Sequence, residues 1–160
     1  MKYVIIGNSA AAVGCVEGIR SVDRTGTVTV ISDEPYPVYS RPLISYLLCG
    51  KTDEEHMKYR PDDFYRKNGV KVLLGRKAVG VDPRRKTVSL ETGEQVPFDR
   101  LLFATGSHPF VPPMEGLESV EKKFSFMKLD DAKALGAALS EKTRVLIVGA
   151  GLIGLKCAEG

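Results

Sequence analysis

The sequence predicts an α/β fold with a parallel sheet and helices, an antiparallel β-meander inserted into it, and the start of a second strand–turn–helix unit. Three observations predict this. A glycine turn joins an apolar strand to a helix near each end of the 160-residue chain. Strands and helices alternate over residues 1–74, which is typical of a parallel sheet. Three short strand-like segments separated by turns then follow within residues 78–98.

The first glycine turn lies at Gly7, directly after the apolar segment 3–6. Four small residues follow it: Ser9, Ala10, Ala11 and Ala12. This spacing is typical of the dinucleotide fingerprint G-x-G-x-x-G/A, in which small residues let a pyrophosphate approach the backbone. The N–H groups and positive end of the following helix stabilise its charge. Because Ser9 replaces the second glycine, a tight turn without a ligand is the alternative interpretation.

A second strand is predicted at 27–31, and it leads into the acidic pair Asp33 and Glu34. A carboxylate at this place in a strand–helix–strand unit binds the hydroxyls of a ribose. The separation from Gly7 is typical of such a unit. Both acidic residues are candidates, and we favour Glu34. A polar strand end without a ligand is the alternative.

The segment 35–50 combines a proline-rich extended start with a short predicted helix. Ser40 is a candidate N-cap, Pro42 lies in the first turn, and Gly50 ends the helix. Arg41 at the start of this helix is a candidate phosphate ligand. An ordinary surface arginine is the alternative.

A short helix at 61–69 and a parallel strand at 70–74 are predicted next. The meander that follows comprises the segments 78–81, 87–90 and 95–98. Beyond it, residues 99–106 are expected to form another buried strand.

That strand ends in the small residues Ala104, Thr105 and Gly106. Small residues allow close backbone approach at the carboxyl end of a strand, where α/β sheets bind ligands.

The second glycine turn follows a proline-rich linker at 107–116 and a predicted helix at 129–140. A buried strand is expected at 144–148, immediately before a complete G-x-G-x-x-G that opens a helix. Its glycines are Gly149, Gly151 and Gly154. This is the stricter of the two fingerprints, so the chain holds two candidate dinucleotide turns.

Composition excludes several other classes. Charged residues make up 27% of the chain, and the net charge is +3. With the charges mixed along the chain, neither nucleic acid nor a membrane surface is indicated as a partner. Three cysteines without a C-x-x-C pair argue against a disulfide framework. The sequence holds no metal-ligand spacing, no Ser-His-Asp set and no apolar run of membrane length. A cytoplasmic location is therefore expected.

The order of these elements resembles the FAD-dependent pyridine nucleotide–disulfide oxidoreductase family, in which an NAD(P)H-binding domain interrupts an FAD-binding domain. Within it, segment 33–43 looks most like the branch of NADH–rubredoxin reductases, NADH oxidases and the N-terminal part of the large nitrite reductase subunit. The resemblance implies an FAD-binding domain at 1–112, then a linker and the start of an NAD(P)H-binding domain at 113–160. It also implies an N-terminal piece of a longer protein.

By resemblance, the cofactors are FAD and NAD(P)H. Residues expected to bind FAD come from both ends of the first domain: Gly7, Ser9, Ala10, Ala11, Asp33, Glu34, Arg41, Pro42, Val79, Ala104, Thr105 and Gly106. Among them, the backbone at 9–11 would hold the pyrophosphate, and Val79 would touch the adenine through its backbone. Residues expected to bind the nicotinamide dinucleotide are Gly149, Gly151 and Gly154.

The resemblance implies an oxidoreductase that passes a hydride from NAD(P)H to FAD and on to an acceptor. The acceptor would be a rubredoxin- or ferredoxin-like protein, oxygen or a fused domain, and a homodimer is compatible with the family. Thiol chemistry is not expected because the redox cysteine pair is absent, and no side chain is assigned a catalytic role. Tyr46 stands where ferredoxin reductases of this kind often have a lysine. A non-catalytic FAD- or nucleotide-binding fragment is the alternative.

Overall fold

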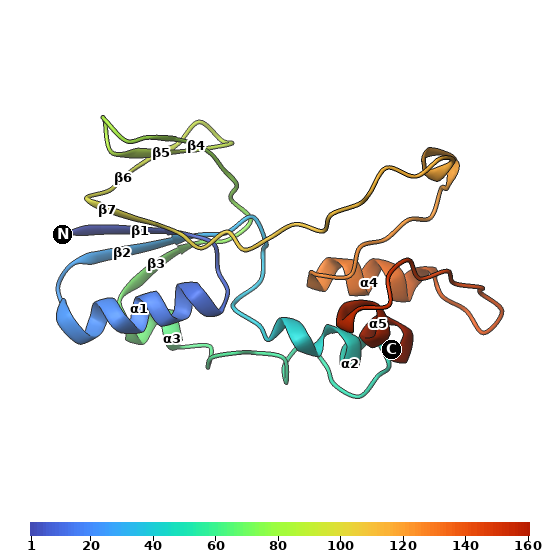
Figure 1. Ribbon diagram of the computed structural model, residues 1–160. Coiled ribbons are helices and arrows are strands. Elements are labelled where there is room, and N and C mark those ends of the chain that lie inside the picture. The colour runs from blue at the N-terminus through green and yellow to red at the C-terminus, as the bar shows by residue number, and fades with distance from the viewer. The chain divides into compact units, whose positions relative to one another are not determined.

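The computed structural model describes residues 1–160, which divide into two compact units (Figure 1). The first unit comprises residues 1–39 and 58–106, and the second comprises residues 40–57 and 107–160. These units are defined by packing, whereas the expected boundary at residue 112 concerns cofactor binding. That boundary stays a prediction.

A four-stranded parallel sheet forms the centre of the first unit, in the order β3-β2-β1-β7. The strands are β1 (Lys2–Ile6), β2 (Thr27–Ile31), β3 (Val70–Leu73) and β7 (Arg100–Phe103). Ile6 is paired with Ile31 on one side and with Phe103 on the other. The carboxyl ends of β1, β2 and β7 therefore meet at one edge of the sheet, as the sequence predicts for a ligand site.

Strand β1 is buried on both faces of the sheet because its side chains alternate between two apolar clusters. Ile5 packs with residues from α1 (Ala10–Val22) and α3 (Phe64–Lys67), including Val13 and Phe64. Val4 and Ile6 pack instead with residues of the meander. The two helices and the meander thus cover opposite faces of the sheet (Figure 1).

The meander is confirmed as an antiparallel sheet of three strands. They are β4 (Ala78–Asp82), β5 (Thr87–Leu90) and β6 (Gln95–Pro97). Val88, Leu90 and Val96 belong to the apolar cluster between the meander and the parallel sheet. The expected strand character of these segments therefore has a plain cause, since alternate residues cover an apolar face.

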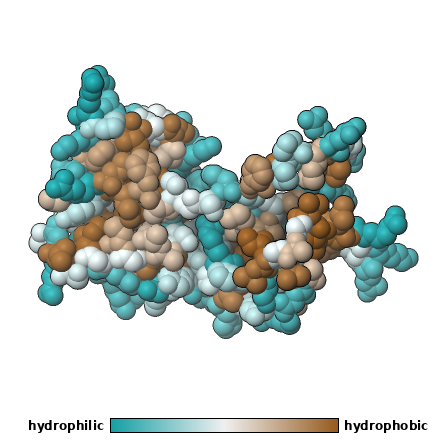
Figure 2. All heavy atoms as spheres, in the orientation of Figure 1, coloured by the Kyte–Doolittle hydropathy of each residue, from teal (hydrophilic) through white to brown (hydrophobic).

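Strand β7 forms where expected, but the expectation that it is buried is wrong. Leu102 is 36% exposed and Phe103 is 63% exposed. The reason is position, because β7 pairs with β1 on one side and lies at the edge of the sheet on the other. Apolar atoms gather in the region of β6 and β7 on the face shown in Figure 2.

The second unit is helical. Its elements are η1 (Arg41–Leu43), α2 (Ile44–Leu48), η2 (Leu117–Ser119), α4 (Leu129–Ala138) and α5 (Leu152–Glu159). Helices α4 and α5 both contact α2, and Ile44, Leu129 and Leu135 are buried there. No helix anywhere in the structure has the length and apolar character needed to cross a membrane.

The strand expected at 144–148 does not form. Val145, Leu146, Ile147 and Val148 are between 36% and 87% exposed. All seven strands of the chain belong to the first unit, so this segment has no neighbouring strand in its own unit. An isolated strand leaves its backbone N–H and C=O groups unpaired, and the segment stays irregular.

Candidate dinucleotide-binding site

The first glycine turn lies between the ends of β2 and β7. The N–H of Gly7 donates to the carbonyl of Ile31 at 2.8 Å, and the N–H of Ala104 donates to the carbonyl of Ile6 at 2.7 Å. Gly7 has φ +115°, and a Cβ at this position would lie 2.0 Å from the Ala104 carbonyl oxygen. Glycine is therefore required here both by the backbone conformation and by the closeness of the Ala104 backbone.

Helix α1 begins directly at this turn and leaves its N-terminal end without a side-chain cap. Ser9 is the N-cap in extended conformation, yet its hydroxyl makes no capping hydrogen bond. No acidic residue lies in the first turn, and Ala10 and Ala11 are exposed. The first N–H groups of a helix have no partner within the helix. This end of α1 can therefore bind an anion through its backbone.

Ala12 occupies the third position of the fingerprint and is 1% exposed. It packs into the cluster between α1 and the sheet, where a larger side chain would force the helix away from β1. The small residues of the turn thus serve two purposes, since Ala12 allows close packing and Ser9 to Ala11 keep the backbone accessible.

The two acidic candidates differ in burial and in hydrogen bonding, and their expected role toward a ribose stays a prediction. Asp33 is exposed, whereas Glu34 is buried just beyond the end of β2. The Tyr39 hydroxyl donates to Glu34 Oε2 at 2.6 Å, and the Glu34 N–H donates to the Ser32 hydroxyl oxygen at 3.2 Å. A carboxylate held by such a bond has a defined orientation. Tyr39 was not singled out by the sequence as its partner.

A second tyrosine contacts the turn itself. The Tyr65 hydroxyl donates to Asn8 Oδ1 at 2.7 Å, and Asn8 Nδ2 donates to the Tyr36 carbonyl at 3.3 Å. Sequence reasoning missed Asn8 and Tyr65, because they lie 57 positions apart. The one signal in the sequence is Asn8 itself, a residue with a hydrogen-bonding side chain at the second position of the fingerprint.

Three further candidates from the first unit have different surroundings. Thr105 and Gly106 are exposed beyond the end of β7, and Gly106 has φ +68°. Val79 is 58% exposed and lies at an irregularity of the β4–β5 register, between Ala78 and Gly80. A β-bulge redirects the residue it contains. The expected roles of these residues toward a cofactor stay predictions.

Arg41 and Pro42 belong to the second unit. Arg41 begins η1, and its Nη1 donates to the Met127 carbonyl at 3.3 Å. Pro42 is exposed in the same turn. The expected helix at this place is divided into η1 and α2. In its first turn the N–H groups of Leu43 and Ile44 donate to the carbonyls three residues earlier, at Ser40 and Arg41, which is the 3₁₀ pattern. The phosphate role of Arg41 stays a prediction.

The second glycine turn also takes the shape of the fingerprint. Gly149 has φ +119°, and α5 begins at Leu152 with Gly151 as its N-cap. A Cβ on Gly154 would lie 2.0 Å from the Gly149 carbonyl oxygen. Gly154 is therefore needed so that the helix can pack against the turn. The local geometry forms even though the strand before it does not.

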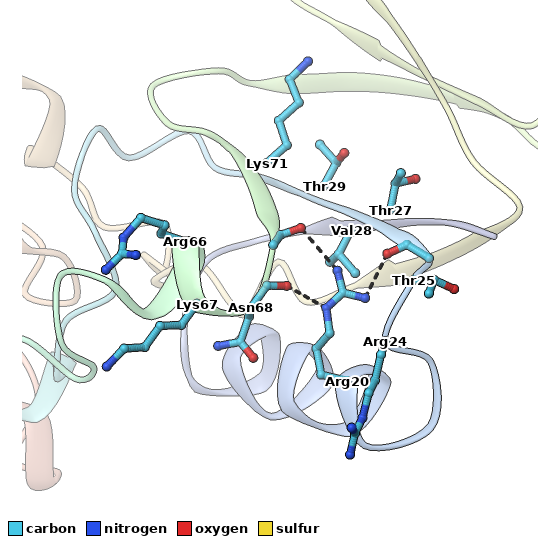
Figure 3. Close-up of a pocket in the computed structure, with 12 residues that line it drawn as sticks. Arg20, Arg24, Thr25, Thr27, Val28, Thr29, Arg66, Lys67, Asn68 and Lys71 are labelled. Atoms are coloured by element: carbon cyan, nitrogen blue, oxygen red, sulfur yellow. Dashed lines mark hydrogen bonds between the residues drawn. The ribbon is translucent and has the colours of Figure 1, made fainter.

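A cavity of about 750 Å³ lies elsewhere, beside the amino ends of β2 and β3 (Figure 3). It is lined by several basic side chains, but Arg66, Lys67, Arg24 and Lys71 point in different directions in Figure 3. Arg20 donates to the carbonyls of residues 23, 26, 68 and 69. Arg20 therefore ties the end of α1 to these loops, and the cavity is remote from the glycine turn.

The three cysteines form no disulfide. All three are free, and burial raises the pKa of Cys15 and Cys157. A raised pKa keeps a thiol protonated and weakly nucleophilic.

Comparison with known proteins gives consistent results. The pyridine nucleotide-disulphide oxidoreductase family matches residues 1–159. The NADH-dependent phenylglyoxylate dehydrogenase subunit epsilon of Aromatoleum evansii is 36% identical over 99% of this chain and 37% of its own length. The nitrite reductase [NAD(P)H] of Bacillus subtilis is 32% identical over 99% of this chain and 20% of its own length.

Solved structures agree. The NADH:rubredoxin oxidoreductase from Clostridium acetobutylicum superimposes with a TM-score of 0.85 at 25% identity, covering 99% of this chain and 40% of that chain. The reductase–putidaredoxin complex gives a TM-score of 0.87 at 27% identity, covering 98% of this chain and 38% of that chain.

The chain spans less than half the length of these relatives. The resemblance of the sequence to this family and to its rubredoxin reductase, NADH oxidase and nitrite reductase branch is confirmed. The chain belongs to the pyridine nucleotide-disulphide oxidoreductase family.

Proposed function

We propose that the first unit binds FAD and that the protein to which these residues belong is an NAD(P)H-dependent flavoprotein oxidoreductase. Bound FAD would supply the redox chemistry, by which a hydride from the nicotinamide would be passed on to an acceptor as electrons. Hydride transfer needs no acid or base from a side chain. The part played by this chain is therefore binding and orientation.

The observation that carries the proposal is the backbone arrangement at Gly7. The turn is brought against the Ala104 carbonyl so closely that no Cβ fits, and the adjoining helix end is left without a side-chain cap. A diphosphate fits such an end, because N–H groups and the helix dipole both stabilise negative charge. These features match the chemistry of an adenine dinucleotide.

Glu34 supplies the second element of recognition. Its buried carboxylate follows β2 at the same edge of the sheet as Gly7. A carboxylate in this place accepts hydrogen bonds from the two hydroxyls of a ribose. We infer that Glu34 binds the adenosine ribose while the backbone of residues 9–11 binds the diphosphate.

The electron donor and acceptor are inferred from the relatives and the second turn. Relatives named for NADH include a phenylglyoxylate dehydrogenase subunit, an NADH oxidase and an NADH-rubredoxin oxidoreductase. The turn from Gly149 to Gly154 has the geometry for a second dinucleotide. We propose NAD(P)H as donor and a rubredoxin- or ferredoxin-like protein as acceptor.

The test is a titration of the purified chain with FAD, followed by quenching of flavin fluorescence. Ser9→Glu places a negative charge at the N-terminal end of α1, and we expect it to weaken FAD binding by at least about 100-fold, because like charges repel strongly at a binding site. Ser21→Glu adds the same charge near the other end of α1 and is expected to leave FAD affinity unchanged.

Two results would overturn the proposal. One is that the unmodified chain binds no FAD at concentrations up to about 1 mM. The dissociation constant would then exceed about 1 mM, which corresponds to a binding free energy weaker than about −4 kcal/mol. The other is an equal loss of affinity in both variants, which would place the bound FAD elsewhere. Because an acidic residue at a helix N-terminus stabilises the helix, loss of folding is not expected for Ser9→Glu.

A second candidate function is a nucleotide-binding module without catalytic activity of its own. The exposure of residues 145–148 and their lack of strand pairing favour it. Addition of NADH to the FAD-loaded chain distinguishes the two functions. Bleaching of the flavin absorption supports an oxidoreductase, whereas a yellow protein that NADH does not bleach supports the module.

A further inference from the structure

The side chain of Asn8 is fixed from two directions at the centre of the first glycine turn. Its Oδ1 accepts a hydrogen bond of 2.7 Å from the Tyr65 hydroxyl. Its Nδ2 donates to the Tyr36 carbonyl at 3.3 Å. Asn8 directly precedes the residues whose backbone N–H groups would meet a diphosphate. Its orientation therefore influences the direction of those groups.

The Tyr65 hydroxyl also contacts a second segment. It accepts a hydrogen bond from the N–H of Val38 at 3.1 Å while it donates to Asn8. One hydroxyl thus connects the glycine turn with the stretch 36–38, which links Glu34 to Tyr39. The Tyr65 hydroxyl therefore joins the two parts of the proposed site, namely the turn that would bind the diphosphate and the segment next to Glu34, which would bind the ribose.

Tyr65 is itself held by the core. Its ring packs edge-on against Phe64, with ring centroids 5.3 Å apart and an interplanar angle of 76°. Phe64 is buried in the cluster that also contains Val38. Burial raises the pKa of Tyr65, so the hydroxyl stays protonated and able to donate at neutral pH. The connection therefore starts from a rigid part of the unit.

We propose that Tyr65 is a positioning residue which, through Asn8, holds the turn from Gly7 to Ala12 in the form that binds a diphosphate. The inference rests on the proposed binding of FAD at this turn. It predicts that removing the hydroxyl, without changing the ring, weakens the site although Tyr65 itself need not touch the ligand.

The experiment compares Tyr65→Phe with Tyr3→Phe in the full chain. Tyr3 is a suitable control because its hydroxyl is also hydrogen-bonded, to Asp23 Oδ2 at 3.1 Å, but lies at the opposite end of β1. Tyr65→Phe removes the hydrogen bonds to Asn8 and from Val38, and we expect it to raise the dissociation constant for FAD about tenfold through the loss of the bond that orients Asn8. Tyr3→Phe should leave it unchanged.

A double-mutant cycle with Asn8→Ala tests whether Tyr65 acts through Asn8. If it does, Tyr65→Phe weakens FAD binding in the unmodified chain but adds little in the Asn8→Ala background. Losses that multiply in the double variant would overturn the proposal. An equal loss in Tyr3→Phe would also overturn it, since the effect would then be a general loss of stability.

Amide hydrogen exchange without ligand separates this proposal from the proposed function. The amides to follow are those of Gly7 and Val13, which donate to the carbonyls of Ile31 and Ser9 and so bracket the turn. Tyr65→Phe is expected to speed their exchange, whereas Tyr3→Phe is not. If the unmodified chain bound no FAD, the proposed function would fail, but faster exchange confined to the turn would still support the positioning role. Unchanged exchange at the Gly7 and Val13 amides would refute it.

Discussion

The two glycine turns of this chain have nearly the same backbone conformation, but the segments that precede them are packed differently. Gly7 and Gly149 adopt φ values of +115° and +119°, and a helix follows each of them. The strand before Gly7 pairs on both sides and is buried. The segment before Gly149 is exposed and forms no strand. Turn geometry is therefore a local property, while a strand depends on its neighbours.

The position of the steric constraint also differs between the turns. In the first turn the missing Cβ of Gly7 leaves room for the Ala104 backbone, which comes from a distant strand. In the second turn the constraint falls on Gly154, which packs against Gly149 of the same turn. The first turn is therefore built into the tertiary structure, and the second is stabilised mainly by its own residues.

The largest expected difference concerns the residues before each turn. Ile5 is 1% exposed, so Ile5→Ala should lower the free energy of unfolding by about 4 kcal/mol through loss of buried surface and creation of a cavity. Leu146 is 87% exposed, and Leu146→Ala should change it by less than about 0.5 kcal/mol. Urea unfolding measures both. Similar losses would show that residues 145–148 are buried in solution.

The next largest effect is expected at the glycines. Gly7→Ala combines an unfavourable φ with a clash against the Ala104 carbonyl, which we expect to cost about 3 kcal/mol. Gly149→Ala has a similar φ but meets no atom within 4 Å, so its cost should be about 1 kcal/mol. Urea unfolding of the two variants measures these losses of stability. Equal losses would contradict the conclusion that only the first turn is packed against a distant strand.

A smaller effect concerns pH. Asp23 Oδ1 accepts hydrogen bonds from the N–H groups of Gly26 and Thr25, and these bonds lower its pKa from 3.8 to about 2. The folded state favours the carboxylate, so this stabilisation is complete above about pH 4 and is lost as the pH falls toward about 2. Asp23→Asn should therefore lower the urea midpoint at neutral pH, with the difference from the unmodified chain narrowing in acid.

Glu159 in α5 is the matched control for Asp23. A hydrogen bond from Lys156 lowers its pKa, but that bond joins two exposed side chains. Glu159→Gln should change the urea midpoint less than Asp23→Asn, and added salt should remove the effect because an exposed ion pair is screened. A salt-sensitive effect at Asp23, or a larger one at Glu159, would contradict this expectation.

Much of the first unit follows from local sequence patterns. The apolar run at 3–6 and the spacing of small residues after Gly7 predict a strand, a turn and a helix, and all three are confirmed. The meander is likewise confirmed. Long-range partners were not predictable, because Tyr65 and Asn8, or Ala104 and Gly7, are brought together only when the whole sheet forms.

Two expectations failed for the same reason. The sequence of β7 and that of residues 145–148 are both apolar and strand-like, and both were expected to be buried. β7 has a partner on one side and forms an exposed edge strand, while residues 145–148 have no partner and form no strand. Apolar character shows that a segment can be buried, but the neighbours decide whether it is.

The sequence by itself determined the two turns, the helices that follow them and the family to which the chain belongs. The turn conformations and helix starts could be predicted because the spacing and size of neighbouring residues specify them, and the same residues carry the resemblance to the family. The tertiary structure decided the contact between Tyr65 and Asn8, the closeness of Ala104 to Gly7, and the burial of each strand. Those outcomes depend on contacts between distant segments, and such contacts exist only after the chain has folded.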